Sequence, residues 1–324
     1  MLVERVNGFI VGLPALPHLP EDLQPPLPQT AHERFFLAIW GDASPHVQPR
    51  TRLIKLVPFT ALLVVVLTML RWFEHRQVYM PDSRIEVESA ALGRPCEDVF
   101  FTAADGVRLN GWFFPANSPR GHLAILLLHG NAGNISHRLN YCQAWLELGV
   151  SVLLFDYRGY GRSEGRPDEE GTYRDAQAAD QWLVKKGFAP DHIIALGKSL
   201  GGGIASELAV RETIGGLILQ NTFTSIPDVG TEIFPFLPVR WLAKIRYDTH
   251  SKLPRVRVPV LVAHSRQDEL IGFHHGERNF AAANEPKMFL ELQGGHNESL
   301  EGTGRAAYLA GLEKYLDRFF PAKP

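Results

Sequence analysis

Apolar and polar positions follow two alternating patterns from about residue 95 to the end of the chain. Short, almost continuous apolar runs predict buried strands, and the amphipathic stretches between them predict helices. An opening hairpin is expected over residues 99–103 and 107–114, turned by Asp105-Gly106. Further strands are expected over 122–129, 150–157, 193–197, 216–220, 259–264 and 287–292, with helices over 137–148, 171–186, 201–210, 276–283 and 305–319. This alternation predicts an α/β fold, in which a mostly parallel sheet carries helices on both faces.

The first fifty residues differ from the rest of the chain. Six prolines lie between Pro14 and Pro28. Because proline fixes φ and removes a backbone donor, we expect residues 1–50 to form a poorly ordered tail. Two alternatives stay open: a polyproline II segment that docks a partner, and a true start codon further downstream.

A long apolar run follows this tail over residues 53–73, with Lys55 and Arg71 near its ends. As a helix, the run would be about 30 Å long, which matches the hydrocarbon core of a bilayer. We therefore expect a single transmembrane helix, with Trp72 at the membrane interface. A buried core helix or the apolar region of a signal peptide is the alternative. The uncharged central part, residues 56–70, is preceded by Arg50, Arg52 and Lys55 and followed by Arg71 and Arg76. This difference slightly favours placement of the following domain outside the cytosol.

Charge and cysteine content exclude several classes of protein. Lys and Arg number 33 against 35 Asp and Glu, so a net charge of −2 gives no global electrostatic case for binding nucleic acid. Two cysteines, Cys96 and Cys142, are too few for a disulfide framework or a four-thiolate zinc site. No H-x-x-H or C-x-x-C spacing stands out, and we expect neither a metal nor an organic cofactor.

The junction between the expected strand 193–197 and the following helix carries a G-x-S-x-G pattern centred on Ser199. A nucleophile on a sharp strand-to-helix turn needs small residues two positions before and after it, because the backbone there is strained and crowded. Gly197 and Gly201 satisfy that need. The pattern in this context predicts a nucleophilic serine, and the alternative is a glycine-rich turn that only packs a helix onto the sheet.

A serine nucleophile needs a base and an orienting acid, which in parallel-sheet hydrolases follow it in the order Ser, Asp, His. Asp268 and His296 each follow an expected strand, where open α/β sheets place their ligands. We predict Asp268 as the acid and His296 as the base. The other candidates are His264, interpreted as structural, His274 and His275, interpreted as a solvated helix face, and Asp248 for the acid.

An oxyanion hole needs backbone N–H groups beside the nucleophile. The segment 129–134 follows the first buried strand, and Leu200 opens the helix behind Ser199. We propose the amides of Asn131 and Leu200 as the two donors, with His129 ordering the loop.

Four segments together resemble the α/β-hydrolase superfamily. They are HGNAGN (129–134), DYRGYG (156–161), GKSLGG (197–202) and GGHNES (294–299). The order of the four segments along the chain is similar to that in the membrane-anchored branch of the superfamily, which comprises the ABHD-type proteins and their bacterial relatives.

This resemblance implies an α/β-hydrolase fold over residues 85–322, with a mostly parallel sheet of the eight-stranded type behind an N-terminal transmembrane helix. It also implies Ser199 as nucleophile, Asp268 as acid and His296 as base, and a structural role for Arg158. One departure is Ile271-Gly272, because many relatives carry a proline shortly after the acid.

A segment rich in Pro and aromatic residues, at about 222–254, is expected to form a small cap over the nucleophile. Phe223, Phe234 and Trp241 are its candidate substrate contacts. An aromatic cap beside a membrane anchor favours hydrolysis of an acyl ester or thioester, with a small lipid-like molecule as substrate. The alternatives are a peptidase of the same superfamily and a non-catalytic, membrane-tethered binding module. The sequence predicts no oligomeric state.

Overall fold

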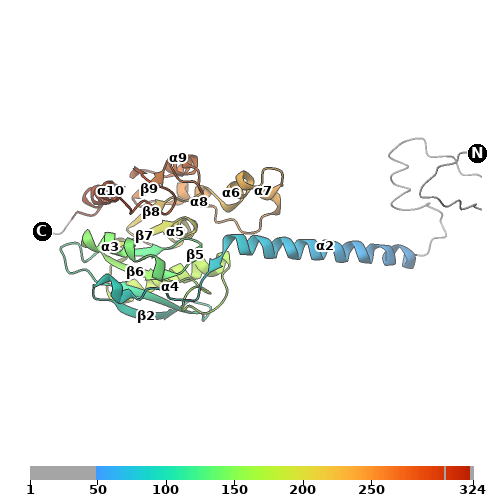
Figure 1. Cartoon of the computed structure of the whole chain (residues 1–324), viewed down its shortest axis with the longest axis horizontal. Helices are drawn as coiled ribbons and strands as arrows, with labels where there is room; N and C mark the ends of the chain where they lie inside the picture. Colours follow the sequence, from blue (N-terminus) through green and yellow to red (C-terminus); the bar gives the residue numbers. More distant parts are fainter. Residues whose placement is uncertain (1–48, 303, 322–324) are drawn as a thin grey trace, which may run out of the picture. The chain divides into compact units, whose positions relative to one another are not determined.

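A computed structural model of the protein describes residues 49–302 and 304–321, with side chains from residue 60 onward. The chain divides into two units, 1–66 and 67–324, and Figure 1 shows the helices and strands of the second. The second unit holds the sheet and the helices that flank it, and it begins earlier than the start expected at residue 85. The proline-rich tail predicted over residues 1–50 lies almost wholly outside the described residues.

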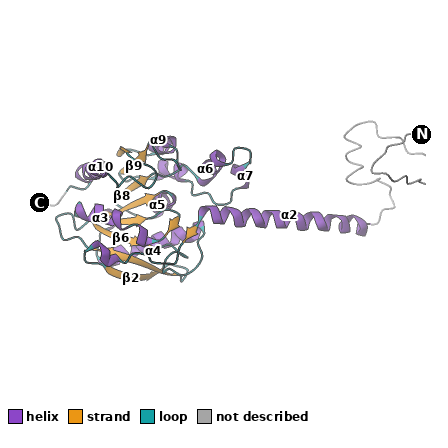
Figure 2. Ribbon diagram, in the orientation of Figure 1, coloured by secondary structure: helices purple, strands orange, loops and turns teal. Residues whose placement is uncertain are grey.

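An eight-stranded sheet forms the centre of the second unit (Figure 2). Its order is β10-β9-β8-β7-β4-β6-β3-β2; the strands from β10 to β6 are parallel, and β3 is antiparallel to both of its neighbours, β6 and β2. The strands are β2 (Glu97–Thr102), β3 (Arg108–Phe114), β4 (Ala124–Leu128), β6 (Ser151–Phe155), β7 (Ile193–Lys198), β8 (Gly216–Gln220), β9 (Val260–Ser265) and β10 (Lys287–Leu292). The predicted mostly parallel sheet with an opening hairpin is therefore confirmed.

Helices cover both faces of this sheet. The long ones are α3 (Leu139–Glu147), α4 (Glu169–Lys186), α5 (Leu200–Arg211), α9 (Phe273–Ala282) and α10 (Gly304–Phe319). Shorter elements are β1 (Met80–Pro81) paired with β5 (Ala132–Gly133), η2 (Ser89–Leu92), η3 (Ile135–His137), η4 (Pro190–His192), η5 (Leu253–Arg255), α6 (Ile226–Ile233), α7 (Val239–Leu242) and α8 (Thr249–Lys252). The last three helices occupy the segment predicted as a cap.

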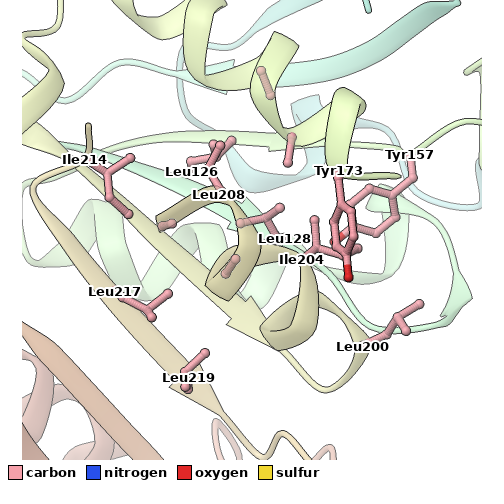
Figure 3. Packing of buried hydrophobic residues seen from close by; sticks show 14 of the residues in the cluster. Leu126, Leu128, Tyr157, Tyr173, Leu200, Ile204, Leu208, Ile214, Leu217 and Leu219 are labelled. Atoms are coloured by element: carbon pink, nitrogen blue, oxygen red, sulfur yellow. The ribbon is translucent and has the colours of Figure 1, made fainter. Parts of the chain in front are cut away.

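Two apolar clusters pack against the two faces because successive side chains of a strand point to opposite sides. Leu126 and Leu128 of β4 join the cluster formed with α4 and α5, which Figure 3 shows from close by. Ile125 and Leu127 of the same strand join the cluster formed with α3 and α10. A strand buried on both faces must be apolar at every position, which is the pattern that the sequence displays.

The local sequence determines where helix α4 begins and ends. The Asp168 carboxylate accepts a hydrogen bond from the Gly171 N–H (2.9 Å) and caps the first turn. Acidic residues follow in the first turn and Lys185 and Lys186 occupy the last, which complements the helix dipole. Gly187 then ends the helix with φ of 110°, a conformation that favours glycine.

A further helix, α2 (Pro49–Val78), contains the span predicted to cross a membrane over residues 53–73. Its side chains before residue 60 lie outside the described residues. Within the described part of the chain, no helix is long and apolar enough to cross a membrane. The transmembrane helix over residues 53–73 stays a prediction. The last residue of α2, Val78, is buried in the core of the second unit.

Candidate active site

Ser199 lies between the last residue of β7 and the first of α5, with φ of 52° and ψ of −117°. Positive φ is uncommon for a residue with a Cβ and stores strain at functional sites. The glycines around it are sterically required. A Cβ at Gly201 would lie 2.0 Å from the Leu128 carbonyl oxygen, and one at Gly197 would lie 2.3 Å from the Gly201 oxygen. The elbow predicted from the G-x-S-x-G pattern therefore has the expected backbone.

Asp268 and His296 are joined directly. The His296 Nδ1 lies 2.7 Å from the Asp268 Oδ2, and the other carboxylate oxygen accepts hydrogen bonds from the N–H groups of Leu270 (2.9 Å) and Ile271 (2.8 Å). Burial alone would raise the pKa of Asp268, but the hydrogen bonds from His296 and these amides hold it below its ordinary value. An ionised Asp268 places the imidazole proton on Nδ1 and leaves the Nε2 lone pair available as a base.

Hydrogen bonds hold the His296 loop beside the elbow. The Lys198 ammonium donates to the Asn297 side-chain oxygen (2.6 Å), and the Asn221 amide donates to the His296 carbonyl oxygen (3.0 Å). Within the described residues, no hydrogen bond joins the Ser199 Oγ to the His296 Nε2, and that contact stays a prediction. Such bonds are often long in ligand-free enzymes and shorten when substrate binds.

The loop predicted to supply an oxyanion donor lies against the nucleophile. A Cβ added to Gly130 would lie 3.6 Å from the Ser199 Cβ. Across the described part of the chain, the N–H groups of Asn131 and Leu200 have no hydrogen-bond partner. Both amides are therefore free to bind developing negative charge.

Two tyrosines fix the shape of this loop. The Tyr157 hydroxyl donates to the His129 carbonyl oxygen (3.0 Å) and the Tyr160 hydroxyl donates to the Asn131 carbonyl oxygen (2.8 Å). The His129 ring itself contacts the Gly130 carbonyl oxygen (2.7 Å). The sequence identified the tyrosine-bearing segment as a signature, but it gave no indication that these hydroxyls support the predicted oxyanion loop.

Lys198 and Asn297 are the residues of this region that the sequence analysis missed. Lys198 is 5% exposed, and burial lowers its pKa to about 7. Each directly adjoins a predicted catalytic residue in the chain. Their position next to Ser199 and His296 was the one feature of the sequence that could have indicated them.

The other residues considered as catalytic base or acid form hydrogen bonds or ion pairs elsewhere. The His264 Nε2 lies 2.9 Å from the Ile271 carbonyl oxygen, and Asp248 accepts a hydrogen bond from the Ser251 N–H at the start of α8. His274 is half-exposed, but His275 is fully buried, so the predicted solvated face is wrong for His275. Both histidines contact Glu232, which α6 brings to them from a distant part of the sequence.

The three cap aromatics do not share one environment. Phe223 is buried in the core, and Phe234 packs edge-on against Phe73 with ring centroids 6.1 Å apart. Trp241 is 90% exposed. The structure therefore does not bring these three side chains together.

Comparison with known proteins agrees with this architecture. The sequence profile of the alpha/beta hydrolase fold family matches residues 124–238. The uncharacterized protein Rv2307c of Mycobacterium tuberculosis is 39% identical over 270 residues, which cover 82% of this chain and 96% of that protein. The alpha/beta hydrolase domain-containing protein WAV2 of Arabidopsis thaliana is 30% identical over 290 residues, covering 82% and 94%.

Two solved structures are similar in fold. The Pyrococcus furiosus esterase Pf2001 has a TM-score of 0.63 at 18% identity, covering 74% of this chain and 99% of that one. An alpha-beta hydrolase from Vibrio vulnificus has a TM-score of 0.58 at 21% identity, covering 87% and 98%. At such identities the likeness shows the fold alone. From its relatives, its sheet and its nucleophile elbow, the chain belongs to the α/β-hydrolase family.

Proposed function

We propose that this α/β hydrolase is a serine esterase or thioesterase that acts through Ser199, His296 and Asp268. The observation that carries the proposal is the 2.7 Å contact between the His296 Nδ1 and the Asp268 carboxylate, beside an elbow that presents Ser199 in a strained conformation. A carboxylate-oriented imidazole next to a serine is the arrangement that activates a hydroxyl as a nucleophile.

In the first half of the reaction, the Ser199 Oγ attacks the acyl carbon and its proton passes to the His296 Nε2. The negative charge that develops on the carbonyl oxygen is stabilised by the N–H groups of Asn131 and Leu200. The tetrahedral intermediate collapses, the bond to the leaving oxygen or sulfur breaks, and His296 donates its proton to the departing alcohol or thiol.

The second half repeats the chemistry with water. His296 removes a proton from a water molecule, which attacks the acyl-enzyme, and the proton then returns to the Ser199 Oγ as the carboxylic acid leaves. Asp268 holds the Nδ1 proton throughout and stabilises the imidazolium that forms twice in each turnover. Apart from the substrate and one water molecule, every group in these steps belongs to the chain.

The proposed substrate is a small acyl ester or thioester. The solved proteins with the same fold include esterases from Pyrococcus furiosus and Exiguobacterium antarcticum. The helical segment between β8 and β9 follows the strand next to the elbow strand, which is a suitable place for a cover over the bound acyl group.

Fluorophosphonate labelling, run beside a panel of p-nitrophenyl esters graded by chain length, tests the proposal. We expect the wild type to be labelled and active, and Ser199→Ala to lose the label and about 10⁶-fold in kcat. Ser251→Ala, which alters an exposed serine on α8, is the matched control and should retain both properties. Labelling of membrane and soluble fractions tests the expected membrane attachment in the same experiment.

An unlabelled wild type that is inactive on every ester would overturn the proposal. Activity that survives Ser199→Ala would assign the reaction to another residue. Ligand binding that is unchanged by this substitution, without turnover, would favour the non-catalytic binding module.

A further inference from the structure

Three side chains that can ligate a metal meet where the helical segment contacts the body of the second unit. Glu232 lies near the end of α6, and His274 and His275 lie in the first turn of α9. Their ligand atoms all fall within 4.8 Å of one another. Among the residues that the structure describes, no other group of three or more His, Cys, Asp or Glu side chains has this arrangement.

We propose that Glu232, His274 and His275 form a binding site for a divalent transition metal ion, with Zn²⁺ as the best-matched ion. The Glu232 Oε1 lies 2.9 Å from the His274 Nε2 and 3.2 Å from the His275 Nε2. Tetrahedral zinc, with bonds of about 2.0–2.1 Å, holds neighbouring ligand atoms about 3.3 Å apart. The two measured separations differ from that spacing by at most about 0.4 Å, and all three ligand atoms fall within 4.8 Å of one another.

The surroundings of His275 suit a metal ligand. Its Nδ1 lies 2.9 Å from the Thr224 hydroxyl, which in turn donates to the Asp228 carboxylate (2.6 Å). With the proton on Nδ1, this chain of donors fixes the ring and turns the Nε2 lone pair toward Glu232. Metal-ligating histidines are held in this way by an acceptor on their second nitrogen. A lone pair facing a carboxylate is repulsive unless a cation lies between them.

The other tautomer needs no metal. In it the Nε2 proton lies between His275 and Glu232, and the Nδ1 accepts a hydrogen bond from the Thr224 backbone N–H (3.2 Å). The two tautomers make opposite predictions about metal binding, and the experiment below separates them.

The site combines one buried ligand with two that are partly exposed. The His275 side chain is fully buried. His274 and Glu232 are 49% and 46% exposed, and the site is open to an ion from solvent. Two imidazoles and one carboxylate suit zinc and its neighbours better than calcium or magnesium, which prefer oxygen ligands.

Bound metal would join α6 to α9, whose ligands Glu232 and His274 are 42 positions apart in the chain. The loop before α9 carries Asp268. An ion here would thus restrain the helical segment against the part of the body that holds the predicted acid. The site stands independently of the proposed esterase reaction, because none of its three ligands takes part in that reaction.

Competition between the protein and a chromophoric chelator for Zn²⁺ tests the proposal on untagged, full-length, metal-stripped protein. We expect the wild type to bind one equivalent. His274→Ala and Glu232→Gln should each weaken binding at least about tenfold, because each removes one of three ligands, and Thr224→Val should weaken it about tenfold by freeing the His275 ring. His192→Ala is the matched control, since it removes one histidine of another contacting pair, in which His192 meets His122 edge-on, and it should bind like the wild type.

Thermal unfolding of the same variants provides a second readout. Zn²⁺ should raise the Tm of the wild type and of His192→Ala, and should raise that of His274→Ala clearly less at the same zinc concentration. The proposal fails if the wild type binds no stoichiometric zinc, which would assign a proton to the space between His275 and Glu232. It also fails if His274→Ala and Glu232→Gln, with cooperative unfolding intact, bind zinc as tightly as the wild type.

Discussion

Lys198 illustrates how one buried charge can make stability depend on pH. Its ammonium group has a single hydrogen-bond acceptor among the described residues, the Asn297 side-chain oxygen, and burial lowers its pKa to about 7, with Arg138 acting in the same direction. In the unfolded chain the lysine pKa is about 10.4. Between these two values the unfolded state binds more protons than the folded state, and the unfolding free energy therefore rises with pH across that interval.

We expect this dependence to disappear in Lys198→Met. Relative to that variant, the unfolding free energy of the wild type should rise between about pH 7 and pH 10, by up to about 1.4 kcal/mol per pH unit. Urea denaturation at a series of pH values measures the unfolding free energy of both proteins. Lys185→Met, which removes an exposed amine, is the control and should run parallel to the wild type. Parallel curves for Lys198→Met and the wild type would mean that Lys198 is not the group responsible.

At the scale of elements, the loop after β6 is held by Arg158. Its guanidinium pairs with the fully buried Asp175 of α4 (2.8 Å) and with Asp105 in the hairpin turn (2.8 Å). The same loop carries the two tyrosines that hold the predicted oxyanion loop. One ion-pair network thus connects the hairpin, α4 and the edge of the candidate active site.

Loss of this guanidinium leaves a buried carboxylate without its partner, which typically costs about 3–5 kcal/mol. Arg158→Met should therefore lower the unfolding free energy by that amount in chemical denaturation. Arg162→Met is the matched control, because its half-exposed pair with Asp98 is worth about 0–1 kcal/mol. Equal losses in the two variants would show that burial does not distinguish the two pairs.

At the scale of the whole molecule, the end of α2 belongs to the hydrolase body. Val78 and Tyr79 are buried in its core, and the Tyr79 hydroxyl lies 2.9 Å from that of Tyr247. The Glu74 carboxylate accepts hydrogen bonds from the backbone N–H groups of Lys244 (2.7 Å) and Ile245 (2.8 Å). The body therefore uses residues before the boundary expected at residue 85.

Two truncated chains test this boundary. A chain begun at Leu67 keeps all of these contacts and should unfold cooperatively near the Tm of the full chain. A chain begun at Arg84 exposes the apolar surface that Val78 and Tyr79 cover, worth about 3–6 kcal/mol, and should lose about 10 °C in Tm. Equal Tm values by differential scanning calorimetry would place the boundary after Asp82-Ser83.

Local sequence patterns were sufficient to predict the strands, the helices and the nucleophile elbow. Apolar runs marked the strands because a strand buried on both faces needs apolar side chains at every position. The glycines around Ser199 marked the elbow because the backbone there leaves no space for a Cβ. Both signals are local, so each could be read from a few adjacent residues.

Contacts between distant residues became visible only in the folded chain. Lys198 and Asn297 are separated by 99 positions, and Glu232 and His274 by 42, yet each pair is in contact. The sequence pattern placed His275 on a solvated helix face, whereas packing buries it completely. Burial, hydrogen-bond partners and shifted pKa values depend on which loops the strand order brings to the same edge of the sheet. No local pattern of residues carries that information.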